Sequence, residues 1–270
     1  MSQLAECFAT LSQRGEGALI TYLMAGDPDL ERSYDYFQAL ITGGADVIEL
    51  GVPFSDPIAD GPTIQAAGRR ALQAKVNLES IFSLVKRLRA YRPLPMVLMS
   101  YYNPIFCLGQ GLFLKRCLDE GISGVIIPDL PIEEAASYLE LARRYRIDTI
   151  FLATPETSDE RLETIIEQSR GFLYLVARYG TTGARAALDP RAERLIAHVR
   201  QQLRNRLPLA VGFGISSPEQ MAAIIGAGGQ GAIVGSTLVE RVAQLCAPDQ
   251  ISSLVRQLKE ATRIPTQRAT

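Results

Sequence analysis

A glutamate and two aspartates in one short stretch of the sequence have the residue types and spacing for acid–base chemistry. Residues 46–65 read DVIELGVPFSDPIADGPTIQ. Glu49 interrupts an apolar run typical of a strand buried on both faces, where a carboxylate is costly unless it is paired, protonated or functional. Asp56 and Asp60 follow on a segment whose prolines and glycines impose a stiff loop. The alternative is structural: Glu49 pairs with an arginine, and the aspartates cap turns.

Composition limits the classes of protein to which this chain can belong. Its 270 residues suffice for one large α/β barrel or two smaller domains. The formal net charge of −1 leaves no basic surface for nucleic acid. No apolar stretch approaches the roughly 20 residues that span a bilayer, and the first residues lack the pattern of a signal peptide. We therefore expect a cytoplasmic protein that binds neither nucleic acid nor membrane.

Cysteine and histidine usage argues against a metal centre. Cys7, Cys107, Cys117 and Cys246 are scattered without CxxC spacing, so we interpret them as reduced thiols. The single histidine, His198, lies in a helical pattern, and no GxSxG motif accompanies it. We predict no metal site and no catalytic histidine.

Short apolar segments alternate with helical patterns along the chain. After a helix over about 2–14, we predict strands at about 18–23, 47–52, 96–99, 124–127, 149–152, 172–177, 209–211 and 232–234. Helical patterns follow each strand, giving about eight strand–helix units, the number that a (β/α)8 barrel needs. The predicted fold class is α/β: a single (β/α)8 TIM barrel with an extra N-terminal helix, occupying 1–270 as one domain. An open doubly wound sheet is the alternative, but the glycine-rich fingerprint that it needs after the first strand is missing.

Two groups of residues follow the strands, where barrels of this kind place their active sites. One group, on the loops after the sixth to eighth strands, is suited to binding phosphate through open backbone N–H groups: Gly180, Gly183, Gly212, Gly214, Gly235 and Ser236. Tight turns alone are the alternative explanation for these glycines. The other group is aromatic and suits a flat ring: Tyr22, Tyr101, Tyr174 and Phe213. The lysines fall on predicted helices or their ends, which argues against a Schiff base and favours carboxylate acid–base chemistry.

The stretch 49–65 resembles the signature of the tryptophan synthase α subunit family. The similarity extends to 25–29, 101–104, 128–131, 182–183, 212–216 and 235–236. This resemblance implies a (β/α)8 lyase of tryptophan biosynthesis, which cleaves indole-3-glycerol phosphate by a retro-aldol reaction to indole and glyceraldehyde 3-phosphate. It implies that Glu49 is the acid/base that protonates C3 of the indole, and that Asp60 accepts from the indole N–H.

The resemblance also implies binding residues and a partner. It places Tyr174 near the substrate, gives Thr182 a contact with the catalytic aspartate, and assigns the phosphate to Gly183, Gly214, Gly235 and Ser236. The implied partner is the tryptophan synthase β subunit, which receives indole through a tunnel. The implied assembly is α2β2. Pyridoxal phosphate is expected only in that partner, and no cofactor in this chain. The implied compartment is the cytoplasm, or an organelle stroma for a plastid-encoded protein.

One segment departs from the family pattern. Residues 177–183 read ARYGTTG, with Thr181 where the family usually has valine. Because this loop is the family's mobile lid, the departure bears on lid closure and partner coupling. Two alternatives stay open: a lyase that releases free indole without a partner, and a barrel that has lost activity and only regulates its partner.

Overall fold

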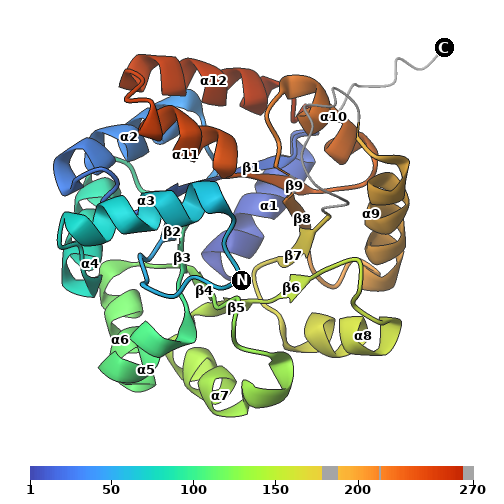
Figure 1. Cartoon of the computed structure of the whole chain (residues 1–270). Helices are drawn as coiled ribbons and strands as arrows, with labels where there is room; N and C mark the ends of the chain where they lie inside the picture. Colours follow the sequence, from blue (N-terminus) through green and yellow to red (C-terminus); the bar gives the residue numbers. More distant parts are fainter. Residues whose placement is uncertain (178–187, 213, 264–270) are drawn as a thin grey trace.

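A closed ring of parallel strands lies at the centre of the molecule, as the computed structural model shows for residues 1–177, 188–212 and 214–263 (Figure 1). In these ranges the strands are β1 (Ala18–Met24), β2 (Val47–Gly51), β3 (Met96–Met99), β4 (Gly124–Ile126), β5 (Asp148–Ile150), β6 (Leu152–Ala153), β7 (Leu173–Val176), β8 (Leu209–Gly212) and β9 (Gly231–Val234). The helices are α1 (Gln3–Gln13), α2 (Leu30–Gly43), α3 (Pro62–Gln73), α4 (Leu78–Tyr91), α5 (Tyr102–Leu108), α6 (Gln110–Glu120), η1 (Ile132–Glu134), α7 (Ala136–Tyr145), α8 (Asp159–Gln168), α9 (Pro190–Leu203), α10 (Pro218–Gly226), α11 (Ser236–Ala243) and α12 (Pro248–Glu260).

The strand order shows how the sheet closes. Neighbouring strands follow the order β5-β4-β3-β2-β1-β9-β8-β7-β6, and every pair is parallel. The strands at the two ends of this order, β5 and β6, are consecutive in sequence and separated by Phe151 alone. They are therefore two parts of one barrel stave, and the predicted (β/α)8 barrel is confirmed.

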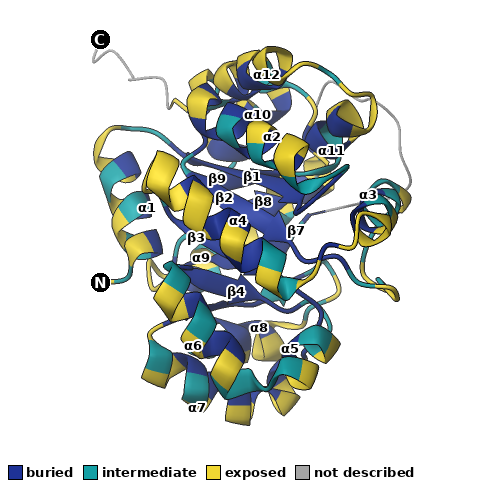
Figure 2. Ribbon diagram, turned by 90° about the vertical axis from the view of Figure 1, so that its left-hand side faces the viewer, coloured by how far each residue is buried: buried dark blue, intermediate teal, exposed yellow. Residues whose placement is uncertain are grey.

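Helix α1 packs against one end of the barrel, which we call the floor. Its buried face, Leu4, Phe8 and Leu11, joins a cluster of side chains from the barrel interior that includes Phe172. The rings of Phe8 and Phe172 lie 5.7 Å apart. Figure 2 shows α1 at the opposite end of the barrel from α3, so the extra N-terminal helix was predicted correctly and leaves the other end, the mouth, for chemistry.

A second, larger core fills the space between the strands and the outer helices. Each helix around the barrel wall buries one face in this layer and exposes the other, as the alternation of dark and yellow along the ribbons in Figure 2 shows. This amphipathic pattern is what made the helices visible in the sequence. None of the helices in the described ranges has the length and apolarity that crossing a bilayer requires.

Two predicted helices are each two helices in the structure. The helix expected after the third strand breaks at Gly109, where φ of +89° ends α5 and begins α6. The final helix divides into α11 and α12, with Leu245 at φ +55° between them. In both places the apolar periodicity continues across the break, so the pattern by itself predicts one element.

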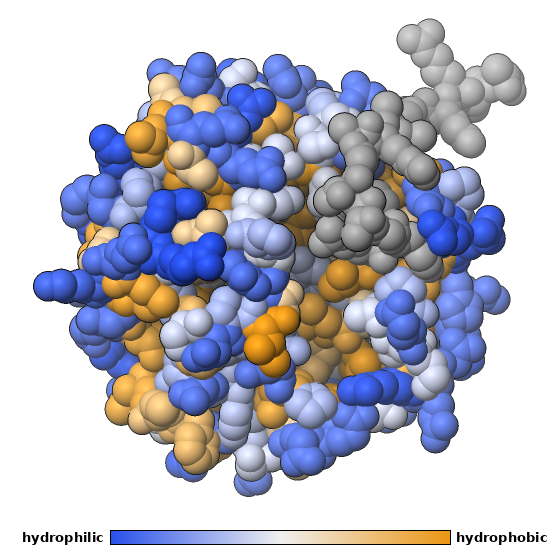
Figure 3. Space-filling view, viewed as in Figure 1, coloured by the Kyte–Doolittle hydropathy of each residue, from blue (hydrophilic) through white to orange (hydrophobic). Residues whose placement is uncertain are grey.

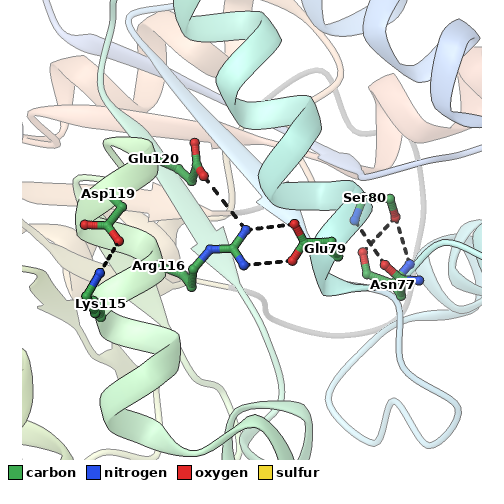
Figure 4. A network of polar contacts seen from close by, with 7 residues as sticks. All are labelled: Asn77, Glu79, Ser80, Lys115, Arg116, Asp119 and Glu120. Carbon is green, nitrogen blue, oxygen red and sulfur yellow. Dashed lines mark hydrogen bonds and ion pairs between the residues drawn. The ribbon is translucent and has the colours of Figure 1, made fainter.

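Charged side chains connect neighbouring helices on the outside of the barrel. Arg116 of α6 donates two hydrogen bonds to Glu79 of α4, at 2.8 and 3.0 Å (Figure 4). At the start of α4, Asn77 and Ser80 form a capping box, in which each side chain accepts from the other residue's backbone N–H. These exposed contacts fix the outer helices and lie far from the barrel interior.

Candidate active site

Glu49 lies inside the barrel, on β2, beside Tyr22 of β1 and Val97 of β3 in the strand register. Its side chain is 1% exposed, and its Oε2 atom is buried without a hydrogen-bond partner in the described part of the chain. Burial, and then the nearby charge of Asp60, raise the pKa of Glu49 from 4.5 to about 8. The structural alternative, a pair with an arginine, is not formed within the described residues, and at neutral pH Glu49 holds a proton.

Asp60 reaches the same region from the loop between β2 and α3. The loop turns tightly, since the Asp60 N–H donates to Pro57 O at 3.2 Å and the Gln65 side chain donates to Asp60 O at 2.9 Å. Pro62 then begins α3, as the sequence predicts. Asp60 is half-buried, and burial raises its pKa, although a hydrogen bond from Tyr101 acts in the opposite direction. The loop therefore shields Asp60 more than its proline and glycine content suggests.

Three tyrosines surround the two carboxylates. Tyr22 is buried and Tyr174 is half-buried. The pKa values of both lie well above the usual range, first through loss of solvation and then because Asp60 and Glu49 place negative charge nearby. Tyr101 is 4% exposed, and its pKa is raised by burial and by Asp60. Tyr22 comes from β1, Tyr101 follows β3 and Tyr174 lies on β7, so barrel closure brings together residues far apart in sequence.

Two glycines make room for these rings. A side chain on Gly51 would collide with the Tyr22 hydroxyl, and one on Gly212 would collide with the ring of Tyr174. Gly212 thus has a packing role that grouping it with the phosphate glycines did not predict. Gly51 was missed as a site residue; its place two residues after Glu49 in a buried strand was the available signal.

The loops after β8 and β9 meet at the mouth between β1 and β7. Gly235 is the N-cap of α11, and Ser236 is its first residue. The Thr237 side chain donates to Ile215 O at 2.8 Å, which ties the start of α11 to the loop that contains Gly214. Gly214 has φ of +67°, a conformation that favours glycine. Backbone N–H groups at the start of a helix can bind an anion, so this corner has the chemistry that a phosphate needs.

Comparison with known proteins identifies the family. A family model described as tryptophan synthase alpha chain matches residues 8–269. The tryptophan synthase alpha chain of Methanosarcina acetivorans is 46% identical over 258 residues, covering 95% of this chain and 93% of that protein. The chain belongs to the tryptophan synthase α chain family. The alpha chain of Synechocystis sp. is 43% identical over 264 residues, covering 97% of this chain and 99% of that one.

Solved tryptophan synthase structures share the fold. Tryptophan synthase of Mycobacterium tuberculosis superposes with a TM-score of 0.88 at 34% identity, covering 97% of this chain and 99% of that chain. The tryptophan synthase complex of Pyrococcus furiosus gives 0.83 at 39% identity, covering 90% and 98%. As a tryptophan synthase α chain, this protein is a carbon–carbon lyase of the α reaction, which cleaves indole-3-glycerol phosphate and passes indole to a β subunit. The family implies such a partner.

The structure brings together most of the residues that the sequence singled out in this tryptophan synthase α chain. Glu49, Asp60 and the three tyrosines meet at the mouth. The Gly214 loop and the start of α11 meet beside them, because β9 and β8 lie between the strands of Tyr22 and Tyr174. Thr182, Gly183 and Phe213, together with Gly180 and the variant Thr181, lie outside the described residues. Their assignments stay predictions.

Two acidic residues that follow strands have structural partners. Asp27, after β1, is 3% exposed and accepts two 2.7 Å hydrogen bonds from Arg70 of α3. Asp129, after β4, accepts from the Tyr102 N–H at 2.8 Å at the start of α5. A position after a strand is therefore not enough to mark a catalytic acid, because such residues also anchor the helices around the mouth.

The sequence predicts neither a metal site nor a catalytic histidine, and the described residues allow a comparison over their ranges. In those ranges no cluster of three or more His, Cys, Asp and Glu side chains is placed to hold a metal ion. His198 lies on α9, where its Nε2 is 2.7 Å from Asp159 Oδ1 on the outer surface. Cys7, Cys107, Cys117 and Cys246 are free thiols.

Proposed function

We propose that Glu49 and Asp60 carry out the α reaction, with Glu49 as the acid/base and Asp60 as the acceptor for the indole N–H. The observation that carries this proposal is the buried Oε2 atom of Glu49, which has no hydrogen-bond partner among the described residues, together with a pKa of about 8 that keeps the carboxyl protonated at neutral pH. A buried structural carboxyl normally has a charged or hydrogen-bonding partner. The absence of a partner for Glu49 Oε2 among the described residues is expected of a group that exchanges protons with the substrate.

The proposed mechanism balances its protons at one residue. Glu49 gives its proton to C3 of the indole, and positive charge develops at the ring nitrogen, where Asp60 accepts the N–H. The Glu49 carboxylate then takes the hydroxyl proton from the adjacent glycerol carbon. The carbon–carbon bond breaks, its electron pair restores the indole ring, and the hydroxyl carbon becomes the aldehyde. Glu49 ends the cycle protonated, ready for the next substrate.

The binding roles of the remaining residues belong to the same proposal. We assign the indole ring to Tyr22, Tyr101 and Tyr174, the sequence adds Phe213 to the ring site, and the family resemblance adds Thr182 as a partner for Asp60. Gly183, Gly214, Gly235 and Ser236 bind the phosphate. This division is supported by the chemistry at the mouth, where carboxylates and aromatic rings lie together and the α11 N-terminus follows β9, the strand beside that of Tyr22.

The surface for the β subunit is proposed to include the loops after β2 and β3. Ile58, on the first loop, is 83% exposed, and Phe106 of α5 is 67% exposed. Figure 3 views the face of Figure 1 and shows apolar side chains gathered near its centre. Large exposed apolar residues favour a contact surface. Pro53 and Asp56 belong to the first loop, and Asn103 lies in the first turn of α5. We assign these three residues to communication with the partner rather than to chemistry.

The assembly, cofactor and compartment complete the proposal. We expect an α2β2 complex in the cytoplasm, or in the stroma for a plastid-encoded protein, with pyridoxal phosphate only in the β subunit. The chain is expected to act as one domain over 1–270. These statements rest on membership of the family and are tested with the complex.

A steady-state assay tests the proposed function. The purified chain is incubated with indole-3-glycerol phosphate, alone and with a β subunit, and indole is followed in both. We expect slow indole release alone and faster turnover in the complex. No indole under either condition contradicts the proposal. High turnover without any stimulation supports the lyase that needs no partner, and a complex whose indole yield is indifferent to Glu49→Gln supports the inactive regulator.

A further inference from the structure

The side chain of Gln65, the fourth residue of α3, reaches back to the loop that carries Asp60. Its amide nitrogen donates a 2.9 Å hydrogen bond to Asp60 O and a longer one, of 3.4 Å, to Pro57 O. Pro57 O also accepts from the Asp60 N–H at 3.2 Å, which closes a turn over residues 57–60. One side-chain amide therefore holds both ends of the turn that finishes at Asp60.

The chemistry of this contact requires a donor with two protons. The two backbone oxygens can only accept hydrogen bonds, and the NH2 group of glutamine has one proton for each of them. Both partners belong to the main chain, so Gln65 holds the Asp60 backbone and leaves its carboxylate available to the indole nitrogen. A side chain of similar length without a donor cannot make this contact.

The start of α3 has no side-chain cap that could fix the turn. Its N-cap is Gly61, whereas α4 and α8 begin at Asn77 and Ser158, whose side chains accept from the first turn. From another element, the Ala59 N–H donates to the Tyr101 hydroxyl at 2.9 Å, next to the end of β3. The turn is thus held from two directions, and Gln65 makes its connection to α3.

The helix that carries Gln65 is itself anchored to the barrel. Arg70, five residues farther along α3, donates two 2.7 Å hydrogen bonds to Asp27, which follows β1 and is 3% exposed. The buried face of α3 consists of alanine and glycine, small residues that let the helix lie close to the barrel. A hydrogen bond from α3 therefore fixes the turn relative to the barrel mouth.

We propose that Gln65 is a positioning residue for the α reaction, whose side-chain amide fixes the turn 57–60 and so holds the Asp60 carboxylate in place at the mouth. The proposal rests on the role given to Asp60 above. Gln65 acts on Asp60 through the position of the main chain and not through charge. A contact that only supported the start of α3 would contribute to stability and leave turnover unchanged.

The experiment compares Gln65→Met with Gln73→Met in the complex with β subunit. Both substitutions replace an amide by an unbranched side chain of similar length in the same helix. Gln73 is the exposed last residue of α3 and serves as the matched control. A misplacement of about 1 Å can cost roughly 10² in rate, so we expect Gln65→Met to lower kcat by about 10- to 100-fold. KM should change by less than about threefold, because the ring and phosphate sites remain.

Removal of the Asp60 carboxylate separates positioning from a general loss of structure. In an Asp60→Asn background, Gln65→Met should lower kcat by less than about threefold, because the charge that it positions is already gone. A loss of structure would lower kcat by the same factor in both backgrounds. Circular dichroism and the denaturation midpoint report whether each variant folds.

Gln65→Glu tests the donor itself, and it provides the test if Gln65→Met does not fold. A protonated glutamate has the shape of glutamine and an O–H for the Asp60 carbonyl, whereas an ionised one has no donor. The ratio of its kcat to that of the unmodified chain should therefore rise toward one as pH is lowered. Gln73→Glu, on the exposed end of the helix, should give a ratio that does not change with pH.

The outcomes distinguish this inference from the proposed function. If the unmodified chain releases indole while Gln65→Met matches Gln73→Met in kcat, the positioning role is wrong. The same holds if the losses from Gln65→Met and Asp60→Asn simply add, or if the kcat ratio of Gln65→Glu is independent of pH. If the unmodified chain releases no indole with its partner, the proposed function itself fails.

Discussion

Two largely buried carboxylates lie close together along β2: Asp46 directly precedes the strand and Glu49 lies within it. Asp46 has charged and hydrogen-bonding partners, whereas Glu49 has a buried oxygen without one in the described ranges. At the floor, Asp46 accepts from Lys259 Nζ at 2.9 Å and from the Leu19 N–H at 2.8 Å, and Lys259 also pairs with Glu16 at 2.9 Å. Toward the mouth, Glu49 has an oxygen with no partner in the described ranges. Burial raises the pKa of both groups, but Lys259 opposes the rise at Asp46, whereas Asp60 adds to it at Glu49.

This difference separates a structural acid from a reactive one. Removing the partner of a buried charge is strongly destabilising, because the charge is left uncompensated. A buried acid without a partner opposes folding when it ionises, and proteins keep such groups mainly at functional sites. The floor should therefore control stability and the mouth activity, and each prediction below tests that division.

The largest expected effect is on activity, at the mouth. Glu49→Gln keeps the shape of the side chain and its hydrogen-bonding capacity but cannot exchange the proton. We expect kcat to fall by roughly 10²–10⁴ with substrate still bound, the usual scale of general acid–base catalysis. Measured kcat and substrate Kd check this, with Glu49→Asp as a second variant that a rigid strand should tolerate poorly. Near-normal turnover by Glu49→Gln would show that another group moves the protons.

The same substitution should change stability in the opposite direction, and in a pH-dependent way. Between pH 4.5 and about 8 the folded protein holds a proton on Glu49 that the unfolded chain has released. Wild-type stability is therefore reduced as pH rises through this range. Relative to wild type, Glu49→Gln should gain from nearly nothing at pH 4.5 to at most about 5 kcal/mol above pH 8. Denaturant unfolding at several pH values measures the gain; a difference that stays constant with pH contradicts the raised pKa.

Asp60 tests the other half of the mouth. Asp60→Asn removes the charge that faces the indole nitrogen, and we expect kcat to fall by about 10², the low end of general acid–base effects. Asp60→Glu should retain part of the activity, because the carboxylate survives on a loop rather than on a strand. Steady-state kinetics of the two variants provide the comparison. Equal activity for Asn and Glu at this position would mean that charge is not what Asp60 supplies.

At the floor the expected effect is on stability alone. Lys259→Met leaves Asp46 and Glu16 without their shared cation, and hydrogen bonds to charged groups set the loss at about 2 kcal/mol. The control is Lys115→Met, whose exposed pair with Asp119 at 2.6 Å should contribute less than about 1 kcal/mol. Unfolding midpoints and kcat are compared for both. A large fall in kcat for Lys259→Met at temperatures where it is folded would break the division between floor and mouth.

The smallest expected effect lies on the outer wall. His198→Asn removes an exposed contact with Asp159, and such pairs contribute at most about 1 kcal/mol. Activity should be unchanged, because α9 presents this side chain to solvent. Parallel measurement of kcat and the unfolding midpoint suffices. A substantial loss of activity would reopen the question of a catalytic histidine.

Much of the fold could be predicted from local patterns, and the errors have one cause. The strands were found as short apolar runs, because parallel strands of a barrel are buried on both faces, and the helices were found because burial of one face imposes a period of 3.6 residues. The breaks at Gly109 and near Leu245 were missed because apolar residues continue on both sides of them. In the candidate site, Glu49 could be identified as unusual because its neighbours in the strand are apolar. The partner of Asp27 could not be identified from the sequence, because Arg70 lies 43 residues away.

The sequence by itself determined that the chain alternates strands and helices and that Glu49 lies in a buried strand, since these depend on neighbours in the chain. The tertiary structure decided which acids have partners. Asp46 meets Lys259, 213 residues later, and Ala59 meets Tyr101 only because adjacent staves of the closed barrel bring their ends together. Burial can be inferred from periodicity, but pairing depends on positions in space. Pairing is what distinguishes the structural carboxylate of β2 from the reactive one.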